Sequence, residues 1–302
     1  MNALVVGYGS IGKRHARILY EMSEISGVAI LSSQSDLPYI TLTSLEDITS
    51  YNPDYVVISS NTVSHISHLS FLEGNLEGKI FLVEKPLFET FHNLTINKNK
   101  VFVGYNLRFH PVLQKIKKTI SDKKLWSIQV FCGSYLPDWR PGRDYQNTYS
   151  SKRKAGGGVL LDLSHEIDYV NWLAGPIKVD YAVSKKMSDL NIQTDDLLLL
   201  TGRSDNNAQV QISLNYFTRK PCRRILIDGE GISIQGDLIA NSLSIFENNK
   251  LNEYSWPKLK RNDTYITMHQ HIIKGDEKSD LCTYEEGLAT MNLIDIIKTF
   301  SI

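Results

Sequence analysis

Short, wholly apolar runs alternate with amphipathic segments along the N-terminal third of the chain. Residues 3–6 and 27–31 are two such runs, and between them Ile11, Ile18 and Leu19 recur at the spacing of one helix face. Further apolar runs occur within residues 54–62, 79–83 and 101–105. Apolar runs of this kind predict strands buried on both faces. Their alternation with helices predicts an α/β fold with a doubly wound parallel sheet, the Rossmann arrangement.

A different pattern begins near residue 124, where apolar and polar positions alternate with a period of two. It predicts half-buried strands at 126–132, 197–201, 208–216, 224–228 and 242–246, separated by turns such as 205–207 and 229–231. We expect an α+β domain built on one open antiparallel sheet with a helix on one face. The predicted domains are residues 1–120 and 121–302, and the last helix, about residues 284–300, is expected to pack back on the first domain.

The turn after the first strand has the glycine spacing of a dinucleotide-binding fold, Gly7-Tyr8-Gly9-Ser10-Ile11-Gly12. In this motif Gly7 permits the tight turn, Gly9 lets the backbone approach a pyrophosphate, and Gly12 lets the following helix pack on the strand. The anion then accepts hydrogen bonds from N–H groups at the positive end of that helix. Because a strand precedes the turn and a helix follows it, a dinucleotide site is favoured over an ordinary glycine-rich turn.

The end of the second strand bears on the choice of cofactor. An acidic residue commonly binds the adenosine ribose at this position, but the chain has Ser32-Ser33-Gln34 and no carboxylate before Asp36. Hydroxyl groups tolerate a 2′-phosphate that a carboxylate would repel, and Arg14 could pair with that phosphate. These residues favour NADP(H), with NAD(H) as the alternative. The competing interpretation is that Ser32 and Ser33 merely end a strand.

Polar residues follow the predicted parallel strands at their carboxyl ends, where such sheets bind ligands. The candidate cofactor contacts among them are Asn61, Thr62, His65, Glu84 and Lys85. Asn106 and Arg108, after the next strand, are candidate substrate contacts. Lys85 lies in Glu84-Lys85-Pro86, where its ammonium could polarise a carbonyl oxygen or orient a hydroxyl near a nicotinamide. The alternative is a solvated lysine at a strand end. The Lys85–Pro86 bond is a candidate for the cis form.

Residues 156–173 predict a glycine-rich loop that feeds one amphipathic helix. On such a helix Asp162, His165 and Asp168, each three residues apart, share one patch, and Asp168 is a candidate substrate contact. His165 is the natural general acid or base because imidazole titrates near neutrality, and a neighbouring carboxylate would fix its tautomer. Two alternatives remain: a metal site, for which nothing else supplies ligands, and a purely structural role in capping and core packing.

The segment before these glycines is rich in arginine, aromatic and turn residues. It contains Trp139, Arg140, Arg143 and Tyr149, followed by the basic residues 152–154. Arginine binds carboxylate or phosphate with a planar fork, and aromatic rings stack on sugar faces. We interpret the segment as a substrate-binding loop for an anionic or nucleotide-bearing sugar. The alternative is a solvated connector.

The overall charge excludes several classes of partner. Lys and Arg together number 33, as do Asp and Glu, so the formal charge is zero, which disfavours nucleic acid or an anionic membrane as the main partner. Hydrophobic content of 42% and charged content of 22% are ordinary for a globular protein. The three cysteines are far apart and lack zinc-site spacing. The first strand begins at the N-terminus without a signal peptide, so we expect a cytoplasmic protein without a metal site.

Taken in order, the motifs resemble those of the glucose–fructose oxidoreductase, inositol dehydrogenase and rhizopine-catabolism (Gfo/Idh/MocA) family. The ordered set is the glycine turn, Glu-Lys-Pro, Gly-Tyr-Asn-x-Arg-Phe, and Gly-Gly-Gly-x-Leu-x-Asp followed by His-x-x-Asp, and it spans essentially the whole chain. The resemblance implies a Rossmann domain, an α+β domain, a nicotinamide cofactor and a sugar, cyclitol or sugar-nucleotide substrate. It also implies a homodimer or homotetramer formed through the open sheet face.

The resemblance assigns catalysis to Lys85, His165 and Asp162, around the reacting C–O centre. Many family members place the aspartate and histidine four residues apart, whereas here they are three apart. His165 aligns directly, and Asp162 is displaced by one residue. We therefore predict an NAD(P)-dependent oxidoreductase acting on an alcohol or ketone. The alternatives are redox-neutral glycoside cleavage with bound NAD and a non-catalytic dinucleotide sensor. The presence of both Lys85 and His165 favours an enzyme.

Overall fold

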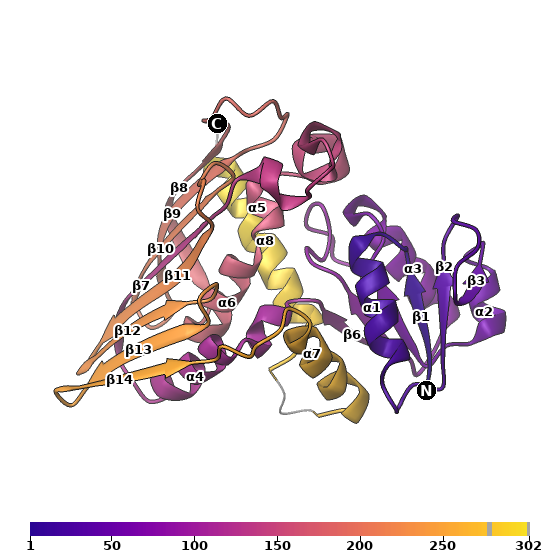
Figure 1. Ribbon diagram of the computed structural model, residues 1–302, viewed down its shortest axis with the longest axis horizontal. Coiled ribbons are helices and arrows are strands. Elements are labelled where there is room, and N and C mark those ends of the chain that lie inside the picture. Colours follow the sequence, from indigo (N-terminus) through magenta and orange to yellow (C-terminus); the bar gives the residue numbers. More distant parts are fainter. Residues whose placement is uncertain (277–279, 301–302) are drawn as a thin grey trace. The chain divides into compact units, whose positions relative to one another are not determined.

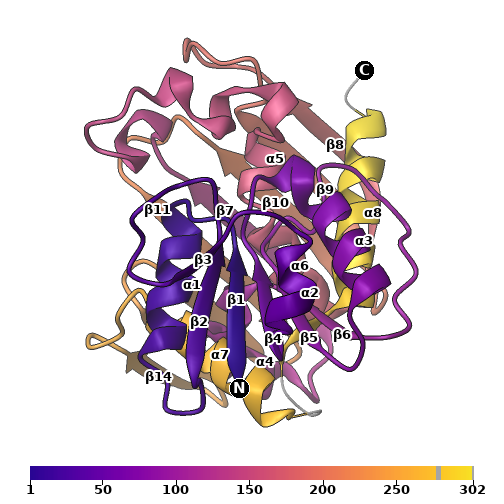
Figure 2. The ribbon, with the colours of Figure 1, turned by 90° about the vertical axis from the view of Figure 1, so that its right-hand side faces the viewer.

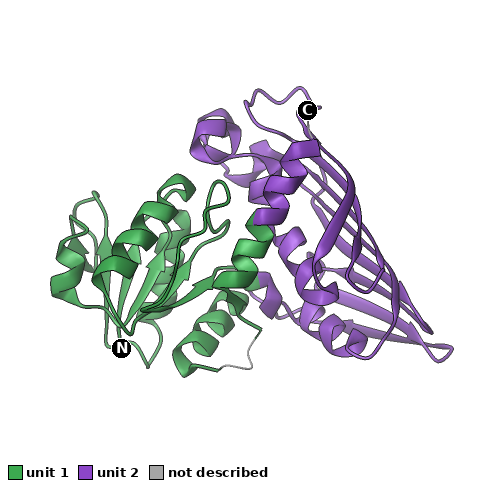
Figure 3. Cartoon of the chain, turned by 180° about the vertical axis from the view of Figure 1, so that it is seen from behind, with its two compact units in different colours: residues 1–106, 261–291 green, residues 107–260, 292–302 purple. Residues whose placement is uncertain are grey.

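The computed structural model describes residues 1–276 and 280–300, which form two compact units (Figure 3). Unit 1 comprises residues 1–106 and 261–291, and unit 2 comprises residues 107–260 and the described residues from 292 onward. The boundary therefore lies 14 residues before the predicted position at 120, because the helix that follows residue 110 packs within unit 2. The chain also returns to unit 1 over residues 261–291. A return was predicted for the last helix alone, and only the part of that helix up to Met291 belongs to unit 1.

Unit 1 is built on a seven-stranded sheet in the order β15-β6-β5-β4-β1-β2-β3. Its strands are β1 (Asn2–Val6), β2 (Gly27–Leu31), β3 (Ile40–Leu42), β4 (Tyr55–Ile58), β5 (Ile80–Val83), β6 (Lys100–Val103) and β15 (Cys282–Thr283). All neighbouring strands are parallel except β15, which is antiparallel to β6. The strand order reverses between β1 and β4. Ligands bind at the carboxyl ends of the strands beside such a reversal.

The described α-helices of unit 1 accompany this sheet, and Figure 2 shows α1 on one side of β1 and α3 on the other. They are α1 (Ser10–Tyr20), α2 (Asp47–Tyr51), α3 (His65–Asn75), α7 (Asp263–Lys274) and the first half of α8 (Tyr284–Phe300). Helix α1 contacts β1, β2 and α7. The connections β1–α1–β2 and β4–α3–β5 run in opposite directions along the sheet, so right-handed crossovers put α1 and α3 on opposite faces. The predicted Rossmann arrangement is confirmed.

Unit 2 is built on an eight-stranded sheet in the order β14-β13-β12-β11-β7-β10-β9-β8. Its strands are β7 (Leu125–Gly133), β8 (Ile177–Lys185), β9 (Leu197–Ser204), β10 (Gln209–Asn215), β11 (Cys222–Gly229), β12 (Ile232–Asp237), β13 (Ser242–Glu247) and β14 (Lys250–Ser255). The open sheet was predicted as wholly antiparallel. One central pair, β7 with β10, is parallel, and the other pairs are antiparallel.

Three helices of unit 2, α4 (Pro111–Ile120), α5 (Val159–Asp162) and α6 (His165–Ala174), pack on this sheet, as Figure 1 shows. The period-two pattern accounts for the packing, because Ile128 and Val130 of β7 are buried whereas Gln129 between them is exposed. Each strand thus turns one row of side chains toward the helices and the other row outward. No described helix has the length and apolar character needed to cross a membrane.

Candidate active site

The glycine turn between β1 and α1 has the shape that a dinucleotide phosphate requires. Gly7 has a φ of +93°, and a Cβ there would lie 2.8 Å from Cα of Ser60. A Cβ on Gly12 would collide with the carbonyl oxygen of Gly7, so only glycine lets α1 approach the turn. Beside Gly9, the N-cap of α1, a Cβ would meet nothing within 4 Å. This open space at a helix N-terminus fits a pyrophosphate.

The residues after β2 border the same turn. The side-chain amide of Gln34 donates to the carbonyl oxygen of Tyr8 (3.2 Å), and the backbone N–H of Gln34 donates to Oγ of Ser32 (3.1 Å). Ser32 is half-buried and Ser33 is exposed. The end of β2 is thus tied to the glycine turn, as a ribose site requires.

Two cations on α1 point to different partners. The Arg14 guanidinium, predicted to meet a 2′-phosphate, lies 5.1 Å from the ring centre of Tyr265 in α7. The neighbouring ammonium of Lys13 instead lies 5.2 Å from the ring centre of Tyr8, in the glycine turn. The structure therefore does not support the phosphate role of Arg14. Lys13 was missed because the sequence does not say which of two adjacent helix positions faces the turn.

His65, predicted as a cofactor contact, braces the backbone instead. Its Nδ1 lies 3.1 Å from the carbonyl oxygen of Pro86 and 3.2 Å from that of Leu87, while Nε2 lies 3.2 Å from that of Ser60. The side chain is buried, and burial lowers its pKa. Both ring nitrogens therefore face protein carbonyls. Asn61 is exposed and Thr62 is half-buried at the adjacent strand end, so both remain candidates for cofactor contact.

The Glu84-Lys85-Pro86 segment follows β5, and its Lys85–Pro86 peptide bond is cis, as predicted. Glu84 is buried, with one carboxylate oxygen 2.8 Å from Nε2 of His15 and the other accepting the backbone N–H of Lys85 at 3.2 Å. Glu84 thus acts inside the fold, and the geometry does not support the predicted cofactor contact. Lys85 is half-buried at the carboxyl end of the sheet. Asn106, also buried, donates to Oγ1 of Thr264 (2.7 Å).

The predicted single helix over residues 156–173 is wrong, because it is broken into two. Helix α5 ends at Asp162 and α6 begins at His165, with Leu163 and Ser164 between them. Asp162 and His165 therefore do not share one helix patch. Asp162 is buried, and its Oδ2 accepts a 2.6 Å hydrogen bond from the hydroxyl of Tyr216. The charge of Asp162 raises the pKa of Tyr149.

Arg108 and Asp168, predicted as substrate contacts, bind each other. Nε of Arg108 donates to Oδ2 of Asp168 (3.1 Å), Nη2 donates to Oδ1 (2.7 Å), and both side chains are 2% exposed. A bidentate pair of this kind is nearly closed to solvent. The geometry therefore indicates a structural role for both residues. It also leaves Asp168 unsuited to the alternative metal site, and no described group of three or more His, Cys, Asp or Glu side chains is arranged to hold a metal ion.

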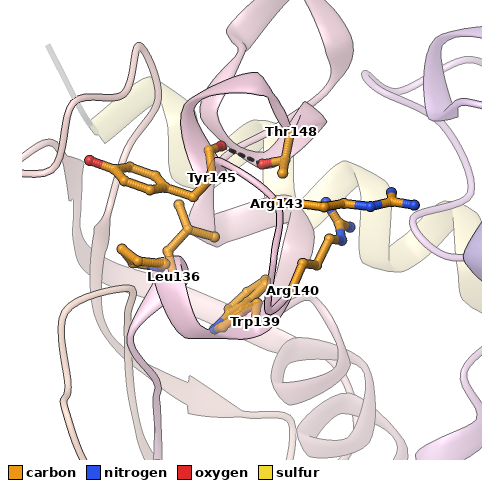
Figure 4. Close-up of a pocket in the computed structure, with 7 residues that line it drawn as sticks. Leu136, Trp139, Arg140, Arg143, Tyr145 and Thr148 are labelled. Atoms are coloured by element: carbon orange, nitrogen blue, oxygen red, sulfur yellow. Dashed lines mark hydrogen bonds between the residues drawn. The ribbon is translucent and has the colours of Figure 1, made fainter.

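The predicted substrate loop forms a small hollow in unit 2, drawn in Figure 4. It is lined by Leu136, Pro137, Trp139, Arg140, Arg143, Tyr145 and Thr148. Figure 4 shows the side chains of Arg140 and Arg143 extending away from Leu136 and Tyr145. The Arg140 guanidinium lies 4.9 Å from the ring centre of Tyr149, and the Trp139 ring packs against Tyr216 at 5.1 Å. Three predicted substrate residues, Trp139, Arg140 and Tyr149, thus join the surroundings of Asp162.

Several residues that contact the predicted site residues could not be recognised from the sequence. His15 contacts Glu84 from 69 positions away and His269 from 254 positions away. Tyr216 lies 54 residues beyond Asp162 and was seen only as the end of a strand. Pairings of this kind arise from tertiary packing, which leaves no local periodicity to read.

The fold and the glycine turn define a class of protein with a dinucleotide-binding unit and a second unit built on an open sheet. Residues 113–235 match the sequence profile of the GFO/IDH/MocA C-terminal domain. Over 132 residues the chain is 26% identical to YteT of Bacillus subtilis, named as an oxidoreductase, and over 204 residues it is 22% identical to the uncharacterized oxidoreductase sll0816 of Synechocystis. These matches cover 41% and 61% of this chain but only 30% and 54% of the two relatives.

Solved structures share the fold over the whole chain. UDP-N-acetylglucosamine 3-dehydrogenase GnnA of Acidithiobacillus ferrooxidans has a TM-score of 0.79 at 17% identity, covering 100% of this chain and 97% of its own. WlbA of Bordetella pertussis, in complex with NADH and UDP-GlcNAcA, has a TM-score of 0.77 at 18% identity, covering 99% and 96%. Levoglucosan dehydrogenase, in complex with NADH, has 0.82 at 16%, covering 100% and 96%. Residues 113–235 thus match the GFO/IDH/MocA C-terminal domain, and the whole chain shares the fold of these dehydrogenases.

Proposed function

We propose that this protein is an NAD(P)-dependent oxidoreductase acting on an alcohol or ketone of a sugar, cyclitol or sugar nucleotide. The observation that carries the proposal is the glycine cradle at Gly7–Gly12, with open space beside Gly9 at the N-terminus of α1. The fold likeness to dehydrogenases crystallised with NADH supports the same cofactor class. Lys85, at the carboxyl end of the same sheet, supports carbonyl chemistry rather than binding alone.

The proposed chemistry gives Lys85 and His165 separate roles. When bound, the nicotinamide supplies the hydride acceptor or donor. In the direction of oxidation His165 takes the hydroxyl proton, and the Lys85 ammonium holds the same oxygen by hydrogen bonding. Asp162, anchored by Tyr216, supplies a fixed negative charge in the proposed substrate site. In the direction of reduction the proton returns along the same path.

NADP(H) is the proposed preferred form of the cofactor. The support is that no carboxylate occurs at positions 32–34 and that the Lys13 ammonium lies beside the glycine turn. A ribose 2′-phosphate is attracted by such a cation and is not repelled by Ser32. The test is the ratio of kcat/KM for NADPH and NADH in the wild type and in Ser32→Asp. We expect the wild type to favour NADPH and the variant to favour NADH, whereas equal wild-type values would contradict the preference.

We also propose that the outward face of the unit 2 sheet joins copies of the chain into a homodimer or homotetramer. Its exposed apolar side chains include Trp126, Leu226, Phe246 and Leu251, on four strands that are close together in the sheet order. Apolar side chains gathered on one exposed face mark an interface. Light scattering after gel filtration measures the mass directly. A monomer at micromolar concentration would contradict the proposal.

Turnover on a panel of substrates tests the proposed activity. The panel contains UDP-N-acetylglucosamine, its uronic acid, myo-inositol and glucose, each with NAD⁺ and NADP⁺, and the readout is the absorbance of reduced nicotinamide. Lys85→Ala and His165→Ala are expected to lose on the order of 100-fold in kcat. The exposed residues Lys118 and His92 supply the matched controls Lys118→Ala and His92→Ala, which should keep wild-type turnover.

Two outcomes would replace the proposal with one of its rivals. Saturable cofactor binding without turnover on any substrate would favour a dinucleotide sensor. Product formation from a glycoside, with cofactor retained and no net change in reduced nicotinamide, would favour redox-neutral cleavage. Near-normal turnover in both Lys85→Ala and His165→Ala would overturn the assignment of the catalytic residues.

A further inference from the structure

A continuous chain of hydrogen bonds runs through the core of unit 1, from Tyr55 on β4 to Glu84 after β5. The Tyr55 hydroxyl lies 2.8 Å from Nδ1 of His269, and Nε2 of His269 lies 2.8 Å from Nδ1 of His15. Nε2 of His15 lies 2.8 Å from Oε1 of Glu84. Tyr55, His15 and His269 are 0% exposed and Glu84 is 6% exposed. Four segments far apart in the sequence thus meet through three short contacts.

The positions of the hydrogens follow from counting donors and acceptors. Burial raises the pKa of Tyr55 and lowers that of His269 well below its usual value, so both groups are neutral at physiological pH. Within residues 1–276 and 280–300, the Tyr55 hydroxyl has His269 as its single hydrogen-bond partner. Its hydrogen must therefore go to Nδ1 of His269, because a buried O–H without an acceptor is costly.

The remaining bonds then have one direction. With Nδ1 of His269 accepting, its Nε2 carries the hydrogen and donates to Nδ1 of His15. Nε2 of His15 in turn donates to Oε1 of Glu84, and Oε2 accepts the backbone N–H of Lys85, so that both oxygens accept, as those of a carboxylate do. If all three hydrogen bonds had the opposite direction, the Tyr55 hydrogen would have no acceptor. If the directions were mixed, two N–H groups would face each other. Every polar atom of the chain is satisfied in this one arrangement.

Glu84 connects this chain to the proposed catalytic lysine. Its second oxygen, Oε2, accepts the backbone N–H of Lys85 at 3.2 Å. Gly104 after β6 makes room for the carboxylate, since a Cβ on Gly104 would lie 2.9 Å from Oε1. His15 thus holds the Glu84 carboxylate by a hydrogen bond, and Gly104 leaves the space that the carboxylate occupies.

We propose that Tyr55, His269 and His15 are positioning residues that hold the Glu84 carboxylate in one orientation and, through it, the backbone at Lys85. The inference rests on the proposed function, because its consequence is the placement of the catalytic ammonium. The hydrogen bond between His15 and His269 also links α1, which follows the glycine turn, to α7. In the sequence α7 comes after the strands of the unit 2 sheet.

Long-range proton–nitrogen NMR of the wild-type protein with ¹⁵N-labelled histidine tests the chain without any activity measurement. Both His15 and His269 are expected to be neutral, with hydrogen on Nε2 and a bare Nδ1. Hydrogen on Nδ1 of either ring, or an imidazolium at neutral pH, would overturn the proposal even if the enzyme were fully active. Tyr55→Phe is expected to release the His269 tautomer, whereas Tyr51→Phe, which removes a hydroxyl bonded to the carbonyl of Ala3, should not.

Turnover of paired variants tests the effect on Lys85. A glutamine amide nitrogen can occupy the position of Nε2, so His15→Gln keeps a donor for Glu84 and His15→Leu does not. Misplacement of a catalytic group by about 1 Å costs on the order of 100-fold in rate. We expect His15→Leu to lose about that factor in kcat with cofactor Kd changed less than about 3-fold, and His15→Gln to recover most of it.

Gly104→Ala provides an independent perturbation, since it leaves all four members of the chain intact. It is expected to lower kcat in the same way as His15→Leu, because the new Cβ displaces the carboxylate. If His15→Leu lowers only thermal stability, and folded protein keeps wild-type kcat and Kd, the chain is merely structural and the positioning role is wrong. If the wild type has no turnover on any substrate, the proposed function fails, while the NMR result still decides the direction of the chain.

Discussion

The hydroxyl of Tyr216 donates a 2.6 Å hydrogen bond to Oδ2 of Asp162, and both groups are buried in unit 2. Tyr216 directly follows β10, whereas Asp162 ends the short helix α5. The carboxylate is therefore positioned from the central strands of the sheet and not by a neighbouring helical turn. Helix α5 ends at Asp162 and α6 begins at His165, so the three-residue spacing between them spans a break in the helix.

Tyr216→Phe is expected to lower kcat about 10-fold, because the substitution removes a short, charge-assisted hydrogen bond worth about 1.5–3 kcal/mol to the Asp162 carboxylate. Tyr181→Phe is the matched control, since Tyr181 is 60% exposed on β8. Steady-state kinetics at saturating cofactor measures both variants. Equal turnover in the two would show that the orientation of Asp162 does not matter for the reaction.

Asp168→Asn is expected to destabilise the protein by about 3–5 kcal/mol, because it leaves the buried Arg108 guanidinium without its counter-charge. The exposed pair of Arg203 and Asp180 has the same bidentate geometry, at 3.1 and 2.9 Å. Asp180→Asn should therefore cost only about 0–1 kcal/mol. Urea unfolding of both variants gives the comparison. A stable Asp168→Asn protein with a raised substrate KM would restore the predicted substrate-binding role.

His110 makes stability depend on pH. Its Nδ1 accepts the backbone N–H of Val112, its Nε2 lies 3.1 Å from Oδ1 of Asn241, and burial lowers its pKa to about 4. The unfolded chain therefore binds a proton between about pH 6.5 and pH 4 that the folded protein does not bind. The free energy of unfolding should fall by roughly 3 kcal/mol as pH drops through this window.

The variant His110→Asn isolates this contribution, since asparagine can still cap the helix but does not titrate. Chemical unfolding of wild type and variant at pH 7 and pH 4.5 measures the difference. The variant should lose less stability on acidification than the wild type. Parallel losses in the two proteins would mean that other groups control the acid sensitivity.

Arg140→Ala and Arg143→Ala are expected to raise the KM of an anionic sugar nucleotide about 10-fold each, the loss of one charged hydrogen bond. The KM of a neutral sugar should change little, because no charge pairing is lost. Arg203→Ala, on the exposed face of β9, is the control. An unchanged KM for the anionic substrate in both variants would identify the segment as a connector.

The sheet of unit 1 was predictable because its central strands are continuous apolar runs. Residues 27–31 were predicted as a strand and form β2 with those bounds. The short edge strands β3 and β15 were missed, since three- and two-residue pairings have no periodicity of their own. The last helix was predicted at 284–300, where α8 lies. After its first turn this segment contains no glycine or proline to interrupt a helix.

The site was only partly predictable. The geometry of the glycine turn was predictable because it depends on the local backbone, and the position of Lys85 was predictable because it follows an apolar strand. Arg108 and Asp168 were misassigned because a lone arginine and a lone aspartate give no sign, in sequence, that they neutralise each other inside the fold. The same limit hid His15 and His269, whose partners lie on other segments of the chain.

The most direct test of the central claim is a tryptophan-fluorescence titration of the purified chain with NADPH and with NADH. The wild type should bind NADPH saturably and more tightly than NADH. Gly12→Ala should lose binding, because its Cβ collides with the carbonyl of Gly7, whereas Gly74→Ala, in open space on α3, should bind as the wild type does. Absence of binding to both cofactors in folded, cofactor-free wild-type protein, or undiminished binding in Gly12→Ala, would contradict the dinucleotide site.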